Sequence, residues 1–430
     1  MISRRAIYDF YQGSLIRNAS VLLISNAILA GSGFIFWVLA ARLFSKSNVG
    51  IASVVIGATS LITSVGLLGL DSGLIRFLEV SPNPKNQIES TCAIVSATTI
   101  VGGIAYIALA PLLSPKLGFI RGDLLDSLIF IAFLVVSVNS TILQATFIAK
   151  GRASFVLLGN SFFSFSKVSL LPLVTAFGAM GIVSASWVAL AISVTLCIAL
   201  MRTKLKLWLR PIYHPGSLGD VRKFATTLFA TGIENNLIQA AIPLVVLNRL
   251  GASKAADYYI VLGAASILNM VPATTFQSLL AEGSRSATDL ALNVHRSIKH
   301  IFILLTPAVV AMLIVGRYIL LLFGRSYSDQ GTSMLQLFAL AVPFYALNYI
   351  ADGVANIRQN NCLFLTMNSI NSGLVLVLSY IFVSGGLTGL GIAWLVAQII
   401  TVAVYGGVMR HDIPKFLRPN SKANLKDGVI

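Results

Sequence analysis

Long apolar segments recur along the whole chain, and short polar or Gly/Pro-containing breaks separate them. Each has roughly 20 residues, the length that a helix needs to cross the hydrocarbon core of a bilayer. Strands of a transmembrane barrel would alternate in polarity, which these segments do not. The pattern therefore predicts twelve membrane-spanning helices, at 21–41, 49–69, 92–113, 125–148, 154–176, 180–201, 224–246, 257–278, 299–323, 332–353, 362–383 and 387–408.

The composition excludes a water-facing surface for most of the 430 residues. Apolar residues make up 56% of the chain and charged residues 11%, with a mean hydropathy of +0.85. Soluble globular proteins carry roughly 25% charged residues. A soluble domain, a disordered chain, a coiled coil and a nucleic-acid-binding protein are thus excluded, despite a net charge of +16. The expected solvent and partner is the lipid bilayer.

The positive charges are distributed unevenly over the predicted topology. With a cytoplasmic N-terminus, 22 of the 31 Lys and Arg residues lie in inside segments and 8 in outside loops, while Lys167 lies within a span. Cytoplasmic loops of membrane proteins carry an excess of Lys and Arg. We therefore predict that both termini are cytoplasmic and that much of the net charge is a topology signal.

The two halves of the chain show signs of duplication. Three landmarks recur at an offset of 207 or 208 residues, namely Arg42 and Arg249, Asn160 and Asn368, and Trp187 and Trp394. Six spans in each half predict parallel repeats around an axis along the membrane normal, with a central cleft between them. The expected parts are an amphipathic cytoplasmic segment (1–20), an N-terminal six-helix bundle (21–201), a basic cytoplasmic connector (202–223), a C-terminal six-helix bundle (224–408) and a basic cytoplasmic tail (409–430).

Two charged residues lie near the middle of predicted spans, Lys167 in 154–176 and Glu234 in 224–246. A charge at mid-membrane costs about 2.5–3.5 kcal/mol, so each should face protein or water. Either the two charges only hold helices together, or Lys167 attracts an anion and Glu234 couples to a cation or proton. The second interpretation is favoured, because intramembrane charges generally mark a pathway. Further polar candidates for the cavity are Asn26, Asn235, Asn236 and Gln239.

A polar stripe at Asn348, Asp352 and Asn356 recurs every four residues, which places all three on one helix face. The stripe serves either as hydrogen-bonding glue between helices, worth about 0.6 kcal/mol per bond on average, or as the wall of a wet cavity. In the second case Asp352 joins Glu234 as a candidate for ion coupling.

Arg42 and Arg249 end predicted spans at equivalent points of the two halves, and Arg76 ends the second span. Snorkelling to headgroups explains each arginine taken singly. A pseudo-twofold axis would bring Arg42 and Arg249 to opposite lips of one cleft, where planar guanidinium groups suit a bulky anion such as a diphosphate. All three arginines, with Lys167, are therefore candidate substrate-binding residues.

The sequence has no signature of a catalytic or metal site. Cys92, Cys197 and Cys362 lie far apart in apolar runs and fit no metal or disulfide spacing. No Gly-rich phosphate loop precedes a Lys-Ser/Thr pair, and no predicted outside loop is long enough to hold an enzyme site. We expect no enzyme, no metal and no cofactor, leaving open a coupling proton or sodium ion.

Five stretches carry a family resemblance, in order along nearly the whole chain: ARLFSKSNVGIAS at 41–53, GLDSGLIRF at 69–77, SLLAEGSR at 278–285, LLLFGRSYSDQG at 320–331 and GLTGLGIAWLVAQ at 386–398. Together they resemble landmarks of the Wzx-type polysaccharide or O-antigen flippases, within the multidrug/oligosaccharidyl-lipid/polysaccharide exporter superfamily. Arg42 stands at the family-like ARL position, with Arg249 as its repeat mate.

This resemblance implies a flippase of the inner (cytoplasmic) membrane in polysaccharide or lipopolysaccharide biosynthesis. Such a protein moves a polyprenyl-diphosphate-linked oligosaccharide to the outer leaflet by alternating access, without hydrolysing ATP. The implied cavity is cationic, so the acidic Glu234 departs from the pattern and points to ion coupling. The implied further partners are a polysaccharide polymerase and assembly proteins.

Other interpretations make different demands on the sequence. A drug or cation antiporter of the same superfamily predicts more acidic than basic groups in the cleft. A membrane-embedded glycosyl-transfer enzyme or polysaccharide polymerase needs a long outside loop with catalytic carboxylates or arginines, and none is visible. A membrane scaffold without transport activity does not explain why the charged residues Lys167 and Glu234 lie within predicted spans.

Overall fold

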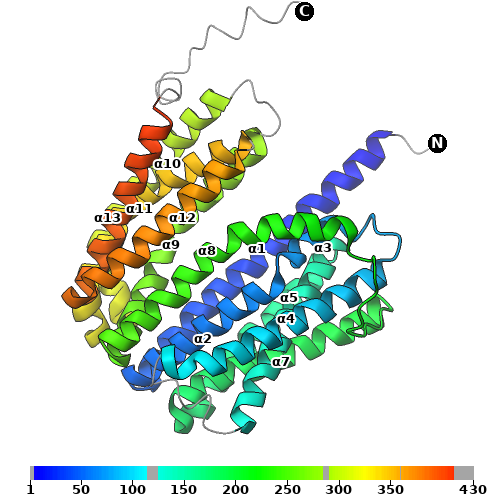
Figure 1. The fold of residues 1–430 in the computed structure, drawn as a ribbon, viewed down its shortest axis with the longest axis horizontal. Coiled ribbons are helices and arrows are strands. Elements are labelled where there is room, and N and C mark those ends of the chain that lie inside the picture. The colour runs from blue at the N-terminus through cyan, green and yellow to red at the C-terminus, as the bar shows by residue number, and fades with distance from the viewer. Residues whose placement is uncertain (1–3, 114–123, 284–289, 359, 411–430) are drawn as a thin grey trace, which may run out of the picture. The chain divides into compact units, whose positions relative to one another are not determined.

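The structure is a computed structural model that describes residues 4–113, 124–283, 290–358 and 360–410 (Figure 1). These residues form helices joined by turns and by a longer connector between α7 and α8, and they contain no strand. The helices are α1 (Arg4–Leu43), α2 (Lys46–Leu67), α3 (Leu70–Phe77), α4 (Pro84–Leu113), α5 (Leu124–Ala149), α6 (Ala153–Leu170), α7 (Gly178–Lys204), α8 (Gly219–Arg249), α9 (Ala252–Gly283), α10 (Leu290–Phe323), α11 (Arg325–Ile357), α12 (Asn361–Phe382) and α13 (Gly386–Val408), with 3-10 turns η2 (Leu171–Phe177) and η4 (Val383–Gly385).

Each predicted apolar segment falls on these helices, which confirms the all-helical membrane class. Nine segments of the described residues are long and apolar enough to cross a membrane. Two of the nine, Ala153–Lys204 and Cys362–Val408, hold a pair of helices each, joined by η2 and η4. Helix α8 covers the predicted span 224–246 in addition to these.

Internal contacts divide the chain into two units, Met1–Ala256 and Asp257–Ile430. In the first unit α2 packs on α4, α7 and α8, while α5 packs on α4 and α7. In the second unit α11 packs on α10, α12 and α13. Helix α8 thus packs within the first unit, although the sequence assigns it to the second bundle; the division of the spans six and six stays a prediction.

Glycines explain how closely α2 and α3 approach the following helices of the first unit. A Cβ atom on Gly50 would lie 1.8 Å from the carbonyl oxygen of Ala252, and one on Gly69 would lie 2.5 Å from that of Ala225. Gly69 also has a φ of +73°, which favours glycine. Small residues let helix backbones come together in a membrane, where apolar side chains gain nothing by leaving lipid.

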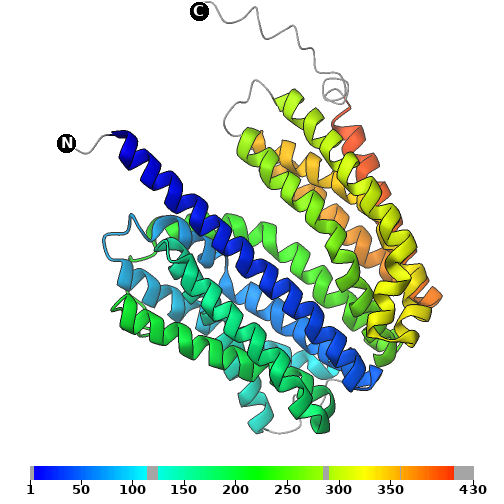
Figure 2. The same cartoon turned by 180° about the vertical axis from the view of Figure 1, so that it is seen from behind.

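Residues 4–20 of the predicted N-terminal segment are helical and continue directly into the first span, because α1 runs without a break from Arg4 to Leu43; the cytoplasmic, amphipathic role of the segment stays a prediction. Forty residues at 1.5 Å each make a helix of about 60 Å, roughly twice the hydrocarbon thickness. Figure 2 shows its N-terminal part extending past the other helices of the first unit. The sequence from Arg4 to Ser20 contains no proline that would end the helix.

The connector between α7 and α8, residues 205–218, lies in an ordered conformation against the first unit. Leu207 and Leu209 pack on two buried clusters formed mainly by α3, α4, α5 and α7. Between them Trp208 is 64% exposed. The backbone N–H of Leu207 donates to the carbonyl of Met201 at 3.2 Å. The basic loop predicted from the charge pattern is therefore also a packed part of the fold.

Candidate functional site

The three candidate arginines all lie at helix ends, as predicted for Arg42 and Arg249, whereas Arg76 ends the short helix α3 and not the second span, which ends with α2 at Leu67. Arg42 is in the last turn of α1, Arg76 in that of α3 and Arg249 in that of α8, and all three side chains are exposed. The guanidinium of Arg76 lies 5.5 Å from the ring centre of Phe77. Positive charge at a helix C-terminus interacts favourably with the helix dipole. Helix-end stability and anion binding are thus both compatible with these positions.

Lys167 lies in α6 and is half-buried between aromatic rings. Its Nζ atom is 4.9 Å from the ring centres of both Phe36 and Phe163. A cation over an aromatic face gains roughly 0.5–2 kcal/mol, depending on how far it is desolvated. The two rings therefore offset part of the cost of a lysine at membrane depth, a contact that the sequence did not predict.

The structure describes the side chains of some of the polar residues predicted in span 224–246 and at Asn26. The amide of Asn236 in α8 donates to the hydroxyl of Ser64 in α2 at 2.9 Å, whereas Gln239 and Asn26 are exposed on their helices. Glu234 and Asn235 lie on α8, and their side chains are outside the described residues. Among the described side chains, Asn236 thus links α8 to α2, which is a structural role.

Asp352 is the centre of a polar network inside the second unit. Its carboxylate on α11 accepts hydrogen bonds from the amide of Asn368 on α12, at 3.0 Å, and from the hydroxyl of Tyr405 on α13. The side-chain amide of Asn356 donates to the backbone carbonyl of Asp352, one turn earlier in α11, at 3.0 Å. The predicted stripe thus joins three helices.

A second part of the network lies one turn away. The amide of Asn348, 5% exposed, donates to the side-chain oxygen of Gln398 at 2.9 Å, and Gln398 donates to that of Asn371 at 3.1 Å. Thr401 also donates to Asn371, at 3.2 Å. The side-chain oxygen of Asn348 is buried and accepts no hydrogen bond from any described residue.

Chemically, the network offers amide, hydroxyl and carboxylate oxygens, the ligands that hard cations prefer. Asp352 is its carboxylate, and no group of three or more His, Cys, Asp or Glu side chains suited to a metal ion occurs in the described part of the chain. The network therefore combines one carboxylate with neutral amide and hydroxyl oxygens. Sequence reasoning found Asn348 and Asp352 but missed Asn371, Gln398 and Tyr405, whose polarity within the last two spans was the available signal.

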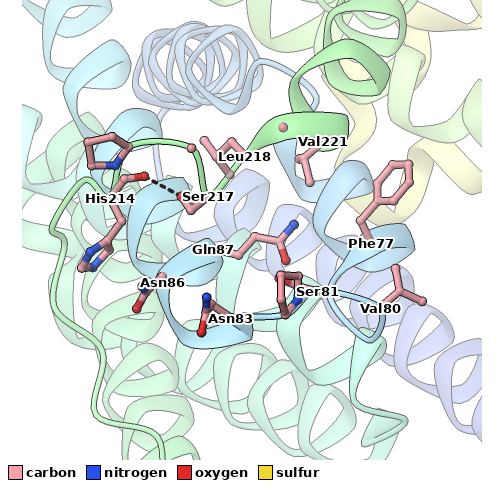
Figure 3. Close-up of a pocket in the computed structure, with 14 residues that line it drawn as sticks. Phe77, Val80, Ser81, Asn83, Asn86, Gln87, His214, Ser217, Leu218 and Val221 are labelled. Carbon is pink, nitrogen blue, oxygen red and sulfur yellow. Dashed lines mark hydrogen bonds between the residues drawn. The ribbon is translucent and has the colours of Figure 1, made fainter.

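A polar pocket of about 390 Å³ lies in the first unit between the start of α4 and the end of the connector (Figure 3). Gln87 and Leu218 are buried in its floor, while Asn83 is exposed at its rim. Gln87 is 3% exposed, and its side-chain oxygen accepts no hydrogen bond from the described residues. The sequence did not predict this pocket, whose amides suit a neutral polar molecule or water.

Glu89 fixes the connector beside this pocket. One carboxylate oxygen accepts the backbone N–H of Arg210 at 3.0 Å, and the other lies 2.9 Å from Nε2 of His214. The hydroxyl of Ser90 accepts the backbone N–H of His214 at 2.8 Å. These contacts join residues more than a hundred positions apart in the sequence.

The fold and these networks define a multi-pass helical membrane protein, and the comparisons found similarity to solved structures. No protein-family model matches the chain, and no curated protein is similar to it in sequence. The inward-facing conformation of a multidrug resistance MATE family transporter of the MOP superfamily matches with a TM-score of 0.71 at 15% identity, over 91% of this chain and 96% of that one. The outward-facing conformation of such a transporter matches with a TM-score of 0.63 at 15% identity, over 94% and 96%.

A third similar structure is a MOP superfamily transporter from Pyrococcus furiosus, whose binding pocket of reverse polarity is described as suggesting a different function. It matches with a TM-score of 0.56 at 13% identity, over 94% of this chain and 96% of that one. These matches show that the chain has the fold of MATE family transporters of the MOP superfamily.

Proposed function

We propose that the chain is a flippase that moves a polyprenyl-diphosphate-linked oligosaccharide across the cytoplasmic membrane by alternating access. The observation that carries the transport part is a fold shared over more than nine-tenths of the chain with both an inward-facing and an outward-facing transporter. The five sequence stretches that resemble Wzx-type flippases support the substrate class.

The charges of the candidate residues agree with an anionic substrate. Arg42, Arg76, Lys167 and Arg249 outnumber the carboxylates of Glu234 and Asp352. In this proposal the diphosphate and the sugars cross through a polar interior, while the polyprenyl tail stays in lipid. Burying an unpaired charge in hydrocarbon is far more costly than pairing it with a guanidinium.

Ion coupling is assigned in this proposal to Asp352 of the second unit and to Glu234 of the first. The network around Asp352 supplies the carboxylate and the amide oxygens for a proton or sodium ion, and Glu234 is the corresponding candidate on α8. In this proposal the protein lies in the inner membrane with both termini in the cytoplasm. A polysaccharide polymerase and assembly proteins would receive the flipped glycan.

A drug antiporter is the second candidate, because one of the similar structures is a multidrug resistance transporter. Deletion of the gene in its host separates the two. The flippase proposal predicts that a lipid-linked glycan accumulates on the inner leaflet, which mass spectrometry and an impermeant periodate probe detect together, with unchanged susceptibility to a panel of cationic drugs. Raised drug susceptibility without glycan accumulation indicates the antiporter instead. Single repeat units gathered on the outer leaflet indicate a polymerase.

A further inference from the structure

A slot of about 270 Å³ opens on the first unit, apart from every candidate site discussed above. Helices α4, α5 and α7 and the connector line it, and α5 packs on both α4 and α7. Most of its wall is aliphatic, including Leu143, Val194, Ile198 and Leu207. Ile198 is 37% exposed, so the slot is open to the surroundings of the helix bundle at this edge.

The length of the slot matches a lipid chain. It runs on α5 from Val135 to Leu143 and on α7 from Val194 to Arg202. Eight residues of helix rise about 12 Å. A bilayer core of about 30 Å gives each leaflet about 15 Å, so the slot takes most of one acyl chain lying along the helices.

Two arginines close the end of the slot that the charge pattern places toward the cytoplasm. Arg202 lies in the last turn of α7 and Arg210 belongs to the connector, and both side chains are exposed. The lining residues include no acidic side chain. The guanidinium of Arg202 lies 4.4 Å from the ring centre of Trp208, and tryptophan is enriched at the level of lipid headgroups.

The backbone of the connector at this end of the slot is held by hydrogen bonds. The backbone N–H of Arg210 donates to the carboxylate of Glu89, and the backbone N–H of Leu207 donates to the carbonyl of Met201. The wall amide of Asn139 is already satisfied by Ser96 and by the carbonyl of Val135, both at 2.8 Å. Binding to a slot whose walls are already ordered costs less conformational entropy.

We propose that this slot binds one anionic phospholipid of the surrounding leaflet, with an acyl chain between α4, α5 and α7 and the phosphate between Arg202 and Arg210. Charge complementarity selects an anionic over a zwitterionic lipid, since basic pockets between membrane helices on the cytoplasmic side bind anionic head groups. The inference does not depend on the proposed flippase activity.

Native mass spectrometry of the purified full chain tests it, with phosphatidylglycerol and phosphatidylcholine as probes. We expect phosphatidylglycerol to be retained at least tenfold better than phosphatidylcholine, and Arg202→Gln/Arg210→Gln to lower its retention at least tenfold. Lys204→Gln/Lys206→Gln removes two charges from the same segment outside the slot and should change retention less than twofold. Equal losses in both double variants, or none in the first, overturn the proposal.

The acyl chain has its own test. Ile198→Trp fills the slot, whereas Ile192→Trp places the same side chain at an exposed position of α7 outside it. Only the first should lower retention of phosphatidylglycerol and of its single-chain lyso form, and glycerol phosphate should not compete. If both variants retain lipid equally, no chain occupies the slot. Displacement by equimolar undecaprenyl phosphate would identify a carrier-lipid site and overturn the assignment to phospholipid.

Discussion

At the residue scale, Asp352 depends on neutral donors from two other helices. Tyr405 and Asn368 both donate hydrogen bonds to its carboxylate. Tyr405 is buried, with 4% of its surface exposed. Charged groups in a membrane bundle persist where protein groups replace the water they have lost. The stability of the second unit is therefore expected to respond to the loss of a single hydroxyl group in this network.

Tyr405→Phe removes that donor and keeps the ring. A buried acceptor that loses a partner costs about 1–3 kcal/mol, so we expect a lower melting temperature of the detergent-solubilised protein. Tyr318→Phe is the control, because Tyr318 is 65% exposed. Equal melting temperatures for Tyr405→Phe and the wild type would show that the hydrogen bond to Asp352 contributes nothing to stability.

At the element scale, the close approach of α2 to the start of α9 depends on one missing Cβ. Gly50→Ala would place a methyl group 1.8 Å from the carbonyl oxygen of Ala252, so backbone must move. We expect a loss of about 3 kcal/mol, the upper part of the usual range for overpacking, measured by thermal or denaturant unfolding.

Gly57 is the matched control on the same helix, because its nearest contact for a Cβ is the carbonyl oxygen of Gln239 at 3.8 Å. Gly57→Ala should be neutral or stabilise by up to about 1 kcal/mol through helix propensity. If the two variants unfold alike, α2 does not pack as described.

The connector provides a second prediction at this scale. Glu89→Gln keeps the shape of the side chain but removes the charge that faces Arg210 and His214, and hydrogen bonds to charged groups contribute about 1.5–3 kcal/mol. Trypsin should then cut faster after Lys204 and Lys206 in the folded protein. Glu79→Gln, an exposed carboxylate nearby in sequence, should leave the cleavage rate unchanged. An unchanged rate in Glu89→Gln would mean that the leucines alone hold the connector.

At the scale of the whole molecule, hydropathy was sufficient to predict the spans but not their contacts. Bilayer thickness imposes the length of each apolar segment, so the sequence shows where the helices lie. Asn348 and Gln398 are 50 positions apart, and Glu89 and His214 are 125 apart. Such pairs depend on which helices become neighbours, which periodicity does not reveal. The alternating Leu205, Leu207 and Leu209 were a local sign that the connector is packed, which the interpretation of the loop by charge alone overlooked.

The proposed transport cycle gives the last prediction, in which two helix-end arginines of the repeat act together. Losing a charge-assisted contact to phosphate costs about 1.5–3 kcal/mol, so Arg42→Gln and Arg249→Gln should each slow glycan translocation tenfold or more at unchanged protein level. The measurement is the rate at which a labelled lipid-linked glycan becomes accessible on the outer leaflet. Arg317→Gln is the control, since Arg317 pairs with Asp329 on an exposed surface at 3.6 Å and should keep the wild-type rate. A normal rate in Arg249→Gln with a slow rate in Arg42→Gln would contradict equivalent roles for the two arginines. Normal rates in both variants would show that neither arginine binds the substrate.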